Sequence, residues 1–377
     1  MIKFWSYKRE LNKYRKNIYS NIFKSINSGQ IFFGDQINRL EKNFTKKYKS
    51  KYGVAVGSGT DAILIALKSL KIKKNDEIIT AANTAIPTIS AIRSVGAIPK
   101  LVDIGEDYLI DVSKIKKVIT KKTKAIIPVH LYGQSCDMDE IIKISKNYKL
   151  KIIEDCAQSQ GAKYRNKFCG TIGDIGCFSF YPTKILGGYG DGGLVLTNKV
   201  ELYHKMKRIR FYGIETLNKK NKFINQYFAN EEGVNSRIDE IQSGILNFKL
   251  SIVERFIKRR RDIANLYFKY LKTSNLKLPN ENKYNFHVYH LFTVYHPQRE
   301  KIISKLKKQS IETRIIYQYP IHKMTAYKKF FKNKKNLKNS VIKSKGLFCL
   351  PLYPEMTNSE VKKVCITIKK IMKSLNL

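Results

Sequence analysis

Residues 54–67 read VAVGSGTDAILIAL, and this stretch decides the fold class. An apolar run enters the small residues 57–60, and apolar residues at helical spacing follow, which predicts a strand, a tight turn and a helix. Small residues at the start of a helix leave backbone N–H groups free, and the helix dipole favours an anion there. The turn is therefore a candidate phosphate cradle. It is neither a Walker loop nor a GxGxxG turn, and GSGT alone equally fits an ordinary strand–turn–helix.

Strand and helix signals alternate from this stretch up to about residue 245. Residues 125–129 (AIIPV) have the pattern of a strand, and residues 138–148 have that of a helix. Such alternation is typical of α/β proteins whose mostly parallel sheet carries crossover helices. We therefore predict a large domain over residues 1–245, with an N-terminal arm.

The remaining residues, 246–377, are predicted to form a smaller C-terminal domain. Residues 241–271 carry apolar residues along one helical face, so a long helix would bridge the two domains. Residues 288–294 (VYHLFTV) have the pattern of a strand in the smaller domain.

Lys184 ends the strand-like run FSFYPTK (178–184), and the glycine-rich stretch GGYGDGG (187–193) follows. Glycines allow a ligand to approach the backbone closely. Burial beside such a site lowers the pKa of a lysine and makes its amine a nucleophile, as a Schiff-base lysine requires. The alternative is a surface lysine, since the chain contains 72 lysines and arginines.

Asp155 follows the short apolar run KII (151–153) in KIIEDCAQ. An acidic residue at the end of a buried strand points into the crevice where α/β proteins bind ligands. There it could hold a pyridine nitrogen protonated, which makes pyridoxal phosphate an electron sink. The alternative is a helix N-cap, which aspartate also favours.

Several segments together resemble the DegT/DnrJ/EryC1/StrS family of sugar aminotransferases. The resemblance covers nearly the whole chain, and the segments occur in collinear order. They are SGQIFFG (28–34), GSGTDA (57–62), AIPKLVDI (97–104), PVHLYG (128–133), EDCAQ (154–158), SFYPTK (179–184), NSRIDEIQ (235–242) and YPIH (319–322). The resemblance implies the pyridoxal-phosphate transferase fold of type I, which is aspartate aminotransferase-like. That fold has a mostly parallel central sheet flanked by helices and a smaller α+β C-terminal domain.

The resemblance also assigns cofactor-binding and catalytic roles to particular residues. Lys184 would form the Schiff base with pyridoxal 5'-phosphate, and Asp155 would pair with the pyridine nitrogen. Gln158 would lie near the ring hydroxyl, and the phosphate would be bound by Gly59, Thr60 and Ser179.

Asn235 would reach the cofactor phosphate of a neighbouring subunit, which implies a homodimer with shared active sites. Alternatively, Asn235 caps the helix that begins near Arg237. His322 is a plausible sugar contact, and Tyr181, Tyr212 and His130 are weaker candidates.

The expected reaction moves an amino group from L-glutamate to a nucleotide-linked keto sugar, with Lys184 as general base and acid. Many family members have an aromatic residue where this chain has Ala85. Ala85 and GDGG (190–193) resemble the branch that acts at the 3-position of the sugar. We therefore expect dTDP-3-keto-6-deoxyhexose as substrate. A 4-keto sugar aminotransferase is the alternative within the family, and a non-catalytic regulator on this fold is the alternative of another class.

Composition limits the other classes of function. Hydrophobic residues make up 43% of the 377 residues, as in a globular protein, and no apolar run is long enough to span a membrane. Six cysteines without a CxxC pair indicate reduced thiols, a cytoplasmic location and no metal site. The net charge of +42 suggests nucleic-acid binding, but lysines are spread along the whole chain. Without a recognition module, we expect no specific nucleic-acid partner.

Overall fold

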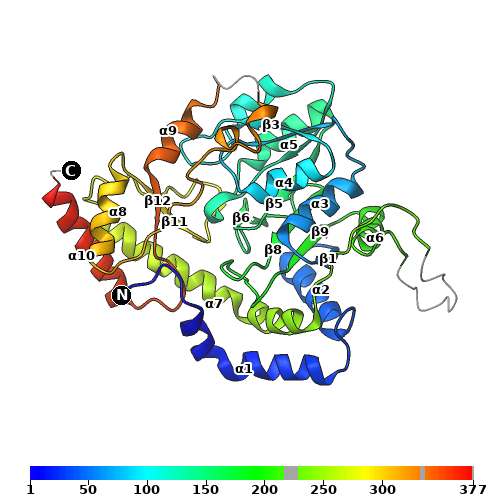
Figure 1. Cartoon of the computed structure of the whole chain (residues 1–377), viewed down its shortest axis with the longest axis horizontal. Coiled ribbons are helices and arrows are strands. Elements are labelled where there is room, and N and C mark those ends of the chain that lie inside the picture. The colour runs from blue at the N-terminus through cyan, green and yellow to red at the C-terminus, as the bar shows by residue number, and fades with distance from the viewer. Residues whose placement is uncertain (216–227, 332–335, 376–377) are drawn as a thin grey trace.

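The computed structural model describes residues 1–215, 228–331 and 336–375 (Figure 1). Two parts of the lysine-rich segments, residues 219–222 and 334–335, lie outside the described residues. A central seven-stranded sheet has the strand order β1-β9-β8-β5-β4-β2-β3. Its strands are β1 (Tyr52–Val56), β2 (Glu77–Ala81), β3 (Ile98–Val102), β4 (Thr123–Ile127), β5 (Lys151–Asp155), β8 (Ile175–Ser179) and β9 (Gly193–Thr197).

The sheet is parallel except for β9, which runs antiparallel to both of its neighbours, β1 and β8. Helices cover both of its faces, because alternate side chains of a strand point to opposite sides. In β9, Val195 packs with residues of α3 (Gly59–Ser69) and α6 (Val200–Ile209). Leu194 and Leu196 pack instead with α2 (Asp35–Tyr48) and α7 (Glu240–Leu271). The predicted α/β fold class is confirmed.

The register of β9 determines where the functional segments meet. Gly193, the first residue of β9, pairs with Val56 on one side and with Ser179 on the other. The turn after β1 and the end of β8 therefore lie next to each other at the carboxyl edge of the sheet. Asp155, the last residue of β5, lies at the same edge because β5 runs parallel to β8.

The remaining helices of this region are α1 (Tyr7–Asn27), α4 (Ile86–Ser94) and α5 (Met138–Tyr148), with short 3-10 turns at Val112–Val118 (η1) and Leu131–Gly133 (η2). A small sheet consists of β6 (Lys163–Tyr164), β7 (Lys167–Phe168) and β10 (Asn285–Phe286). Figure 1 shows α1 along the lower edge of the molecule, below α7.

The long helix α7 spans Glu240–Leu271, close to the predicted 241–271. Its second half contributes to a separate hydrophobic core with the C-terminal elements. These are the strands β11 (Phe292–Tyr295) and β12 (Leu347–Leu350) and the helices α8 (Arg299–Lys308), α9 (Lys338–Gly346) and α10 (Asn358–Ser374), with 3-10 turns at Ile321–Lys323 (η3) and Lys328–Phe330 (η4).

The strand predicted over 288–294 is wrong at its start, because β11 begins only at Phe292. Tyr289 has a φ of 47°, which breaks an extended backbone, and the N–H groups of Val288 and Leu291 donate to Gly133 and Tyr132. None of the helices in the described ranges is both long and apolar enough to span a membrane.

Candidate active site

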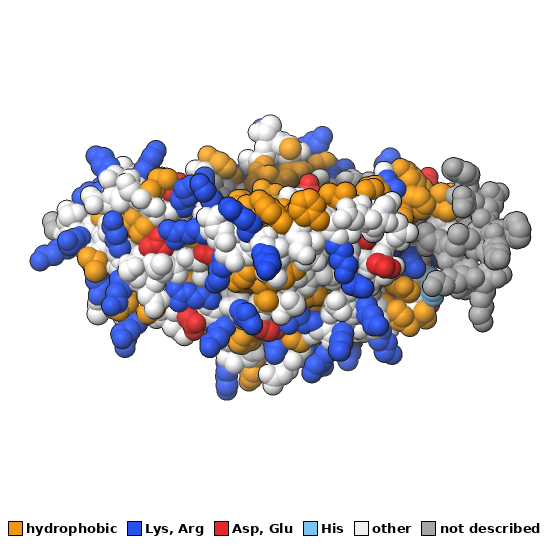
Figure 2. All heavy atoms as spheres, turned by 90° about the horizontal axis from the view of Figure 1, so that it is seen from below, with side chains coloured by type: hydrophobic (Ala, Val, Ile, Leu, Met, Phe, Trp, Pro, Cys, Tyr) orange, Lys and Arg blue, Asp and Glu red, His pale blue; other side chains and the backbone are white. Residues whose placement is uncertain are grey.

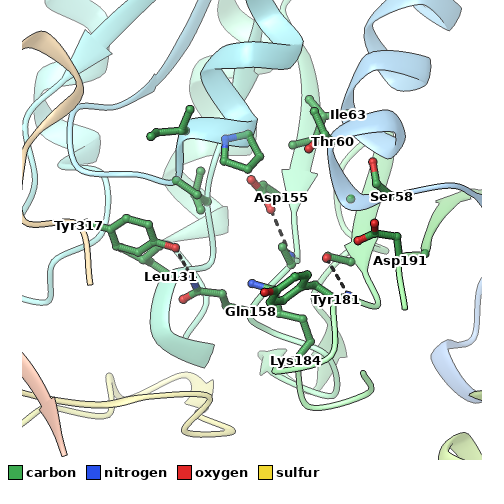
Figure 3. A pocket seen from close by; sticks show the side chains of 18 of the residues that line it. Ser58, Thr60, Ile63, Leu131, Asp155, Gln158, Tyr181, Lys184, Asp191 and Tyr317 are labelled. Carbon is green, nitrogen blue, oxygen red and sulfur yellow. Dashed lines mark hydrogen bonds between the residues drawn. The ribbon is translucent and has the colours of Figure 1, made fainter. Parts of the chain in front are cut away.

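A cavity of about 500 Å³ opens at the carboxyl edge of the central sheet (Figure 3). It is lined by segments far apart in the sequence, including the turn after β1, the ends of β5 and β8, and a loop of the C-terminal region. The predicted residues that it brings together are Gly59, Thr60, Asp155, Gln158, Ser179, Tyr181 and Lys184.

One end of the cavity is the start of α3. Ser58 is its N-cap, and the Ser58 hydroxyl accepts a hydrogen bond from the Asp61 N–H at 3.1 Å. A Cβ at Gly59 would lie 2.6 Å from Ser179 Cβ, so only glycine allows the turn and the end of β8 to come this close. The free N–H groups of the first helical turn and two hydroxyls, Thr60 and Ser179, can therefore bind an anion here.

Asp155 lies in the cavity between Thr60 and Gln158 (Figure 3) and is almost completely buried. Its Oδ2 accepts a hydrogen bond from the Thr88 hydroxyl at 2.8 Å, and its Oδ1 accepts one from the Ala157 N–H at 3.1 Å. No helix begins at Asp155, so the alternative of a helix cap is wrong. These two hydrogen bonds fix the orientation of the carboxylate, which can pair with a cation that enters the cavity.

Lys184 lies in the turn that follows β8, where its N–H donates to the Tyr181 carbonyl at 2.8 Å. Burial lowers the pKa of Lys184 to about 8, although the nearby charge of Asp155 opposes this effect. The glycines that follow are needed for the turn, since a Cβ at Gly187 would lie 2.3 Å from the Pro182 carbonyl oxygen. An uncharged amine therefore faces the cavity at mildly alkaline pH.

Gln158 has a fixed orientation in the cavity wall. Its Oε1 accepts a hydrogen bond from the Tyr132 N–H at 2.7 Å, and its Nε2 donates to the Tyr317 hydroxyl at 2.5 Å. Sequence reasoning missed Tyr317, which comes from the C-terminal loop, although it lies two residues before the YPIH segment. It also missed Thr88, which lies outside the segments that resemble the family.

Part of the cavity lining is apolar. Ala85, Ile86 and Pro87 at the start of α4 contribute to it, together with Val129 and Leu131. A flat ring in the cavity would therefore contact aliphatic side chains, because Ala85 stands where many family members have an aromatic residue.

His130, which was predicted as a substrate contact, does not line this cavity. It is fully buried, with Nε2 3.0 Å from Glu154 Oε2 and with Nδ1 accepting a hydrogen bond from the Cys136 N–H. His130, Glu154 and Cys156 lie close enough together to suggest a metal cluster. However, Glu154 also accepts hydrogen bonds from three backbone N–H groups, so the cluster has a structural role.

Three other predicted residues also lie outside the cavity lining. His322 is buried in η3 and lines a separate shallow depression, so the structure does not support a sugar contact. Tyr212 is exposed, with a φ of 55°, and is not among the lining residues. Asn235 pairs with Phe211 in an isolated β-bridge, and α7 begins at Glu240 with Asp239 as its N-cap, so Asn235 does not cap that helix.

A model of the DegT/DnrJ/EryC1/StrS aminotransferase family matches residues 12–369 of this chain. The chain is 38% identical to dTDP-3-amino-3,6-dideoxy-alpha-D-galactopyranose transaminase of Aneurinibacillus thermoaerophilus, covering 98% of this chain and 99% of that protein. It is 35% identical to dTDP-3-amino-3,4,6-trideoxy-alpha-D-glucose transaminase of Micromonospora megalomicea subsp. nigra, with 98% and 99% covered. GDP-perosamine synthase of Escherichia coli O157:H7 is 34% identical, covering 89% of this chain and 90% of that protein.

Solved structures agree with these sequence matches. DesV of S. venezuelae in complex with a ketimine intermediate superposes with a TM-score of 0.92 at 31% identity, covering 98% of each chain. NtdA of Bacillus subtilis with bound cofactor PMP gives a TM-score of 0.89 at 30% identity, covering 99% of this chain and 85% of that one. The chain therefore belongs to the DegT/DnrJ/EryC1/StrS aminotransferase family.

Proposed function

We propose that this family member transfers the amino group of L-glutamate to dTDP-3-keto-6-deoxyhexose, giving a dTDP-3-amino-3,6-dideoxyhexose. At the coarser level, the chain is a pyridoxal-phosphate-dependent aminotransferase of nucleotide-linked keto sugars. The observation that carries the proposal is a single cavity that joins an anion-binding helix start, a buried carboxylate and a lysine with a lowered pKa.

The residues of the cavity fit pyridoxal phosphate. The N–H groups at the start of α3, with Thr60 and Ser179, suit a phosphate group. Asp155 offers a buried carboxylate for the protonated pyridine nitrogen. Gln158 Nε2 is positioned by Tyr317, and its second N–H remains available to a ring hydroxyl.

When bound, pyridoxal phosphate supplies an electron sink for the electrons of the donor's Cα–H bond. Lys184 Nζ would hold the cofactor covalently, and as a free amine it would take and return the Cα proton of the donor. The Asp155 carboxylate would face the ring nitrogen and would stabilise charge that develops during proton transfer.

Two features support the 3-keto sugar. Ala85 leaves room at the start of α4, and Asp191 of the GDGG segment lines the same cavity. Relatives of similar identity are named for other sugars, so regiochemistry needs a direct test. The purified protein is incubated with dTDP-3-keto and dTDP-4-keto sugars, and the products are identified by mass spectrometry and NMR. Amination only at the 4-position would refute the 3-keto assignment and leave the aminotransferase assignment intact.

The activity itself is tested by the glutamate half-reaction. Purified protein should be yellow, and its absorbance band should shift when glutamate is added. Lys184→Ala should abolish turnover. A protein that binds the cofactor but shows no shift with glutamate would instead be the regulator that the sequence left open.

We propose that the active unit is a homodimer with shared sites. Apolar side chains are exposed at the end of α1 and just after it, namely Tyr19, Phe23, Ile26, Ile31 and Phe32. Figure 2 shows hydrophobic side chains among lysines and arginines on the face seen from below, toward which α1 lies. Burying such apolar surface favours association. Asn235 lies outside the cavity of its own subunit. In a dimer it could complete the cavity of the partner subunit.

Mixing two inactive variants tests this arrangement. Lys184→Ala and Asn235→Ala subunits, unfolded and refolded together, should regain activity, because a mixed dimer contains one site with both native residues. Activity that stays at the level of the separate variants would exclude the shared site.

All six cysteines are free and buried, which supports a reducing compartment such as the cytoplasm for this enzyme.

A further inference from the structure

A second chamber of about 520 Å³ lies beside the cofactor cavity. The two share Gln158, Tyr181, Lys184 and Tyr317 in their lining. The rest of the chamber wall comes from the N-terminal segment and the C-terminal region, and includes Phe4, Trp5, Tyr7, His290, Glu312 and Arg314. Because Lys184 faces both spaces, a molecule in the chamber can reach the same amine as a cofactor in the cavity.

We propose that this chamber holds the amino-acid donor and that Arg314 binds one of its carboxylates. This inference rests on the proposed aminotransferase function and names the residue that recognises the donor.

Arg314 is placed rigidly at the chamber by its backbone. Its N–H donates to the Cys349 carbonyl at 3.2 Å, and the Cys349 N–H donates back at 2.7 Å, which ties the residue to β12. Its side chain is exposed, and among the described residues its guanidinium forms no ion pair or hydrogen bond. A planar guanidinium without a partner matches the two oxygens of a carboxylate.

The acidic residue of the chamber is already engaged. Glu312 Oε2 accepts a hydrogen bond from the Phe4 N–H at 3.0 Å. The N-terminal segment is held next to it, since the Ile2 N–H donates to Ser310 and the Glu312 N–H donates to Ile2. These contacts fix Phe4 and its neighbours as a wall of the chamber and hold Glu312 through one of its two carboxylate oxygens.

His290 adds a polar group without adding charge. It is buried in the chamber wall, and its Nδ1 has no hydrogen-bond partner within the described ranges. Burial, and after it the charge of Lys184, lowers the pKa of His290 well below its usual value, so the imidazole stays neutral. A neutral imidazole can hydrogen-bond a ligand while Arg314 supplies the positive charge.

The chemistry of the two substrates favours the donor for this chamber. In an amino acid, a carboxylate is attached to the very carbon that loses its proton, so a guanidinium near Lys184 has a direct partner. The reacting ring of a keto sugar carries hydroxyl and carbonyl groups, and the anionic diphosphate of the nucleotide-linked sugar lies several bonds away from the carbonyl that reacts at Lys184. Arg314 therefore suits the donor half-reaction and should matter little for the keto sugar.

The test measures the two half-reactions separately. The holoenzyme is mixed with increasing glutamate and the absorbance change is followed in single turnovers, for wild type, Arg314→Gln, Arg314→Lys and Arg255→Gln. Arg255 is an exposed arginine of α7 that lines neither space, so its variant matches the change in net charge. In the reverse direction, the aminated cofactor form is mixed with increasing keto sugar.

Loss of a charge-assisted carboxylate contact should raise the half-saturating glutamate concentration of Arg314→Gln roughly 10- to 100-fold. Arg314→Lys should recover part of this loss, while Arg255→Gln and the keto-sugar half-reaction stay near wild type. An Arg314→Gln enzyme with wild-type glutamate dependence, or one that loses both half-reactions equally, overturns the donor site. A wild-type enzyme that does not respond to glutamate refutes the proposed function and the donor site with it.

Discussion

Lys184 offers a test of cavity electrostatics that needs no substrate. Its pKa in the folded protein is about 8, against 10.5 for a lysine in an unfolded chain. Between these two values the unfolded chain binds more protons at this position than the folded one, so stability rises with pH across that window. Below about pH 8 the folded protein carries the full cost of a desolvated ammonium.

Lys184→Met removes the titration and keeps a side chain of similar length. A difference of about 2.5 pH units, at 1.36 kcal/mol each, amounts to about 3 kcal/mol as an upper limit. Lys184 is only partly buried at the edge of the cavity, and water relaxes around it, so we expect about 1–3 kcal/mol. The cofactor-free variant should therefore be more stable than wild type at pH 7, and this advantage should shrink towards pH 10.

Urea unfolding of both cofactor-free proteins at several pH values between 7 and 10 measures this advantage. All other titrating groups are common to the two proteins, so they cancel in the difference. A difference in unfolding free energy that stays constant from pH 7 to pH 10 would refute the claim that burial lowers the pKa of Lys184. It would also remove the reason to regard Lys184 as a preactivated nucleophile.

Three further substitutions test the residues around the cofactor cavity. Asp155→Asn should slow the glutamate half-reaction roughly 100-fold or more, measured by stopped-flow absorbance, because a neutral amide cannot stabilise the developing charge. Thr88→Val should weaken cofactor binding by about 1 kcal/mol through loss of its hydrogen bond to Asp155, and Thr88→Ser should restore it in an equilibrium titration. Tyr317→Phe should leave Gln158 less well oriented and weaken cofactor binding roughly 5-fold, and an unchanged dissociation constant would contradict this.

The sequence could predict the parts of the site whose signals are local. The strand–turn–helix around Gly59, the strand end at Asp155 and the segment that leads from β8 to Lys184 each carry a pattern within a few residues. Because the carboxyl ends of parallel strands meet at one edge, these patterns are compatible with one site, but only the resemblance to the family joined them into a prediction. The turn after β1 and the end of β8 are brought together by Gly193 of the antiparallel strand β9. No local pattern indicated this strand.

Residues that act through long-range contacts could not be found in this way. Thr88 is 67 positions from Asp155, and Tyr317 is 159 positions from Gln158. Neither has a residue type or a neighbourhood that differs from many other threonines and tyrosines in the chain. Only the packing of α4 and of the C-terminal loop against the sheet edge gives them a role.

His130 shows the opposite case, in which a segment typical of the family suggested a ligand contact and the fold assigns a different role. Because the Cys136 N–H donates to Nδ1, the ring proton lies on Nε2 and is donated to Glu154 Oε2. The other hydrogen bonds of Glu154 come from the N–H groups of Gly170, Ile172 and Gly173, in the loop that leads into β8. His130 and the buried Glu154 thus hold the start of the strand whose far end carries Ser179. His130→Gln should therefore lower the free energy of unfolding more than it changes the glutamate dependence of the half-reaction, and the reverse result would return His130 to the substrate site.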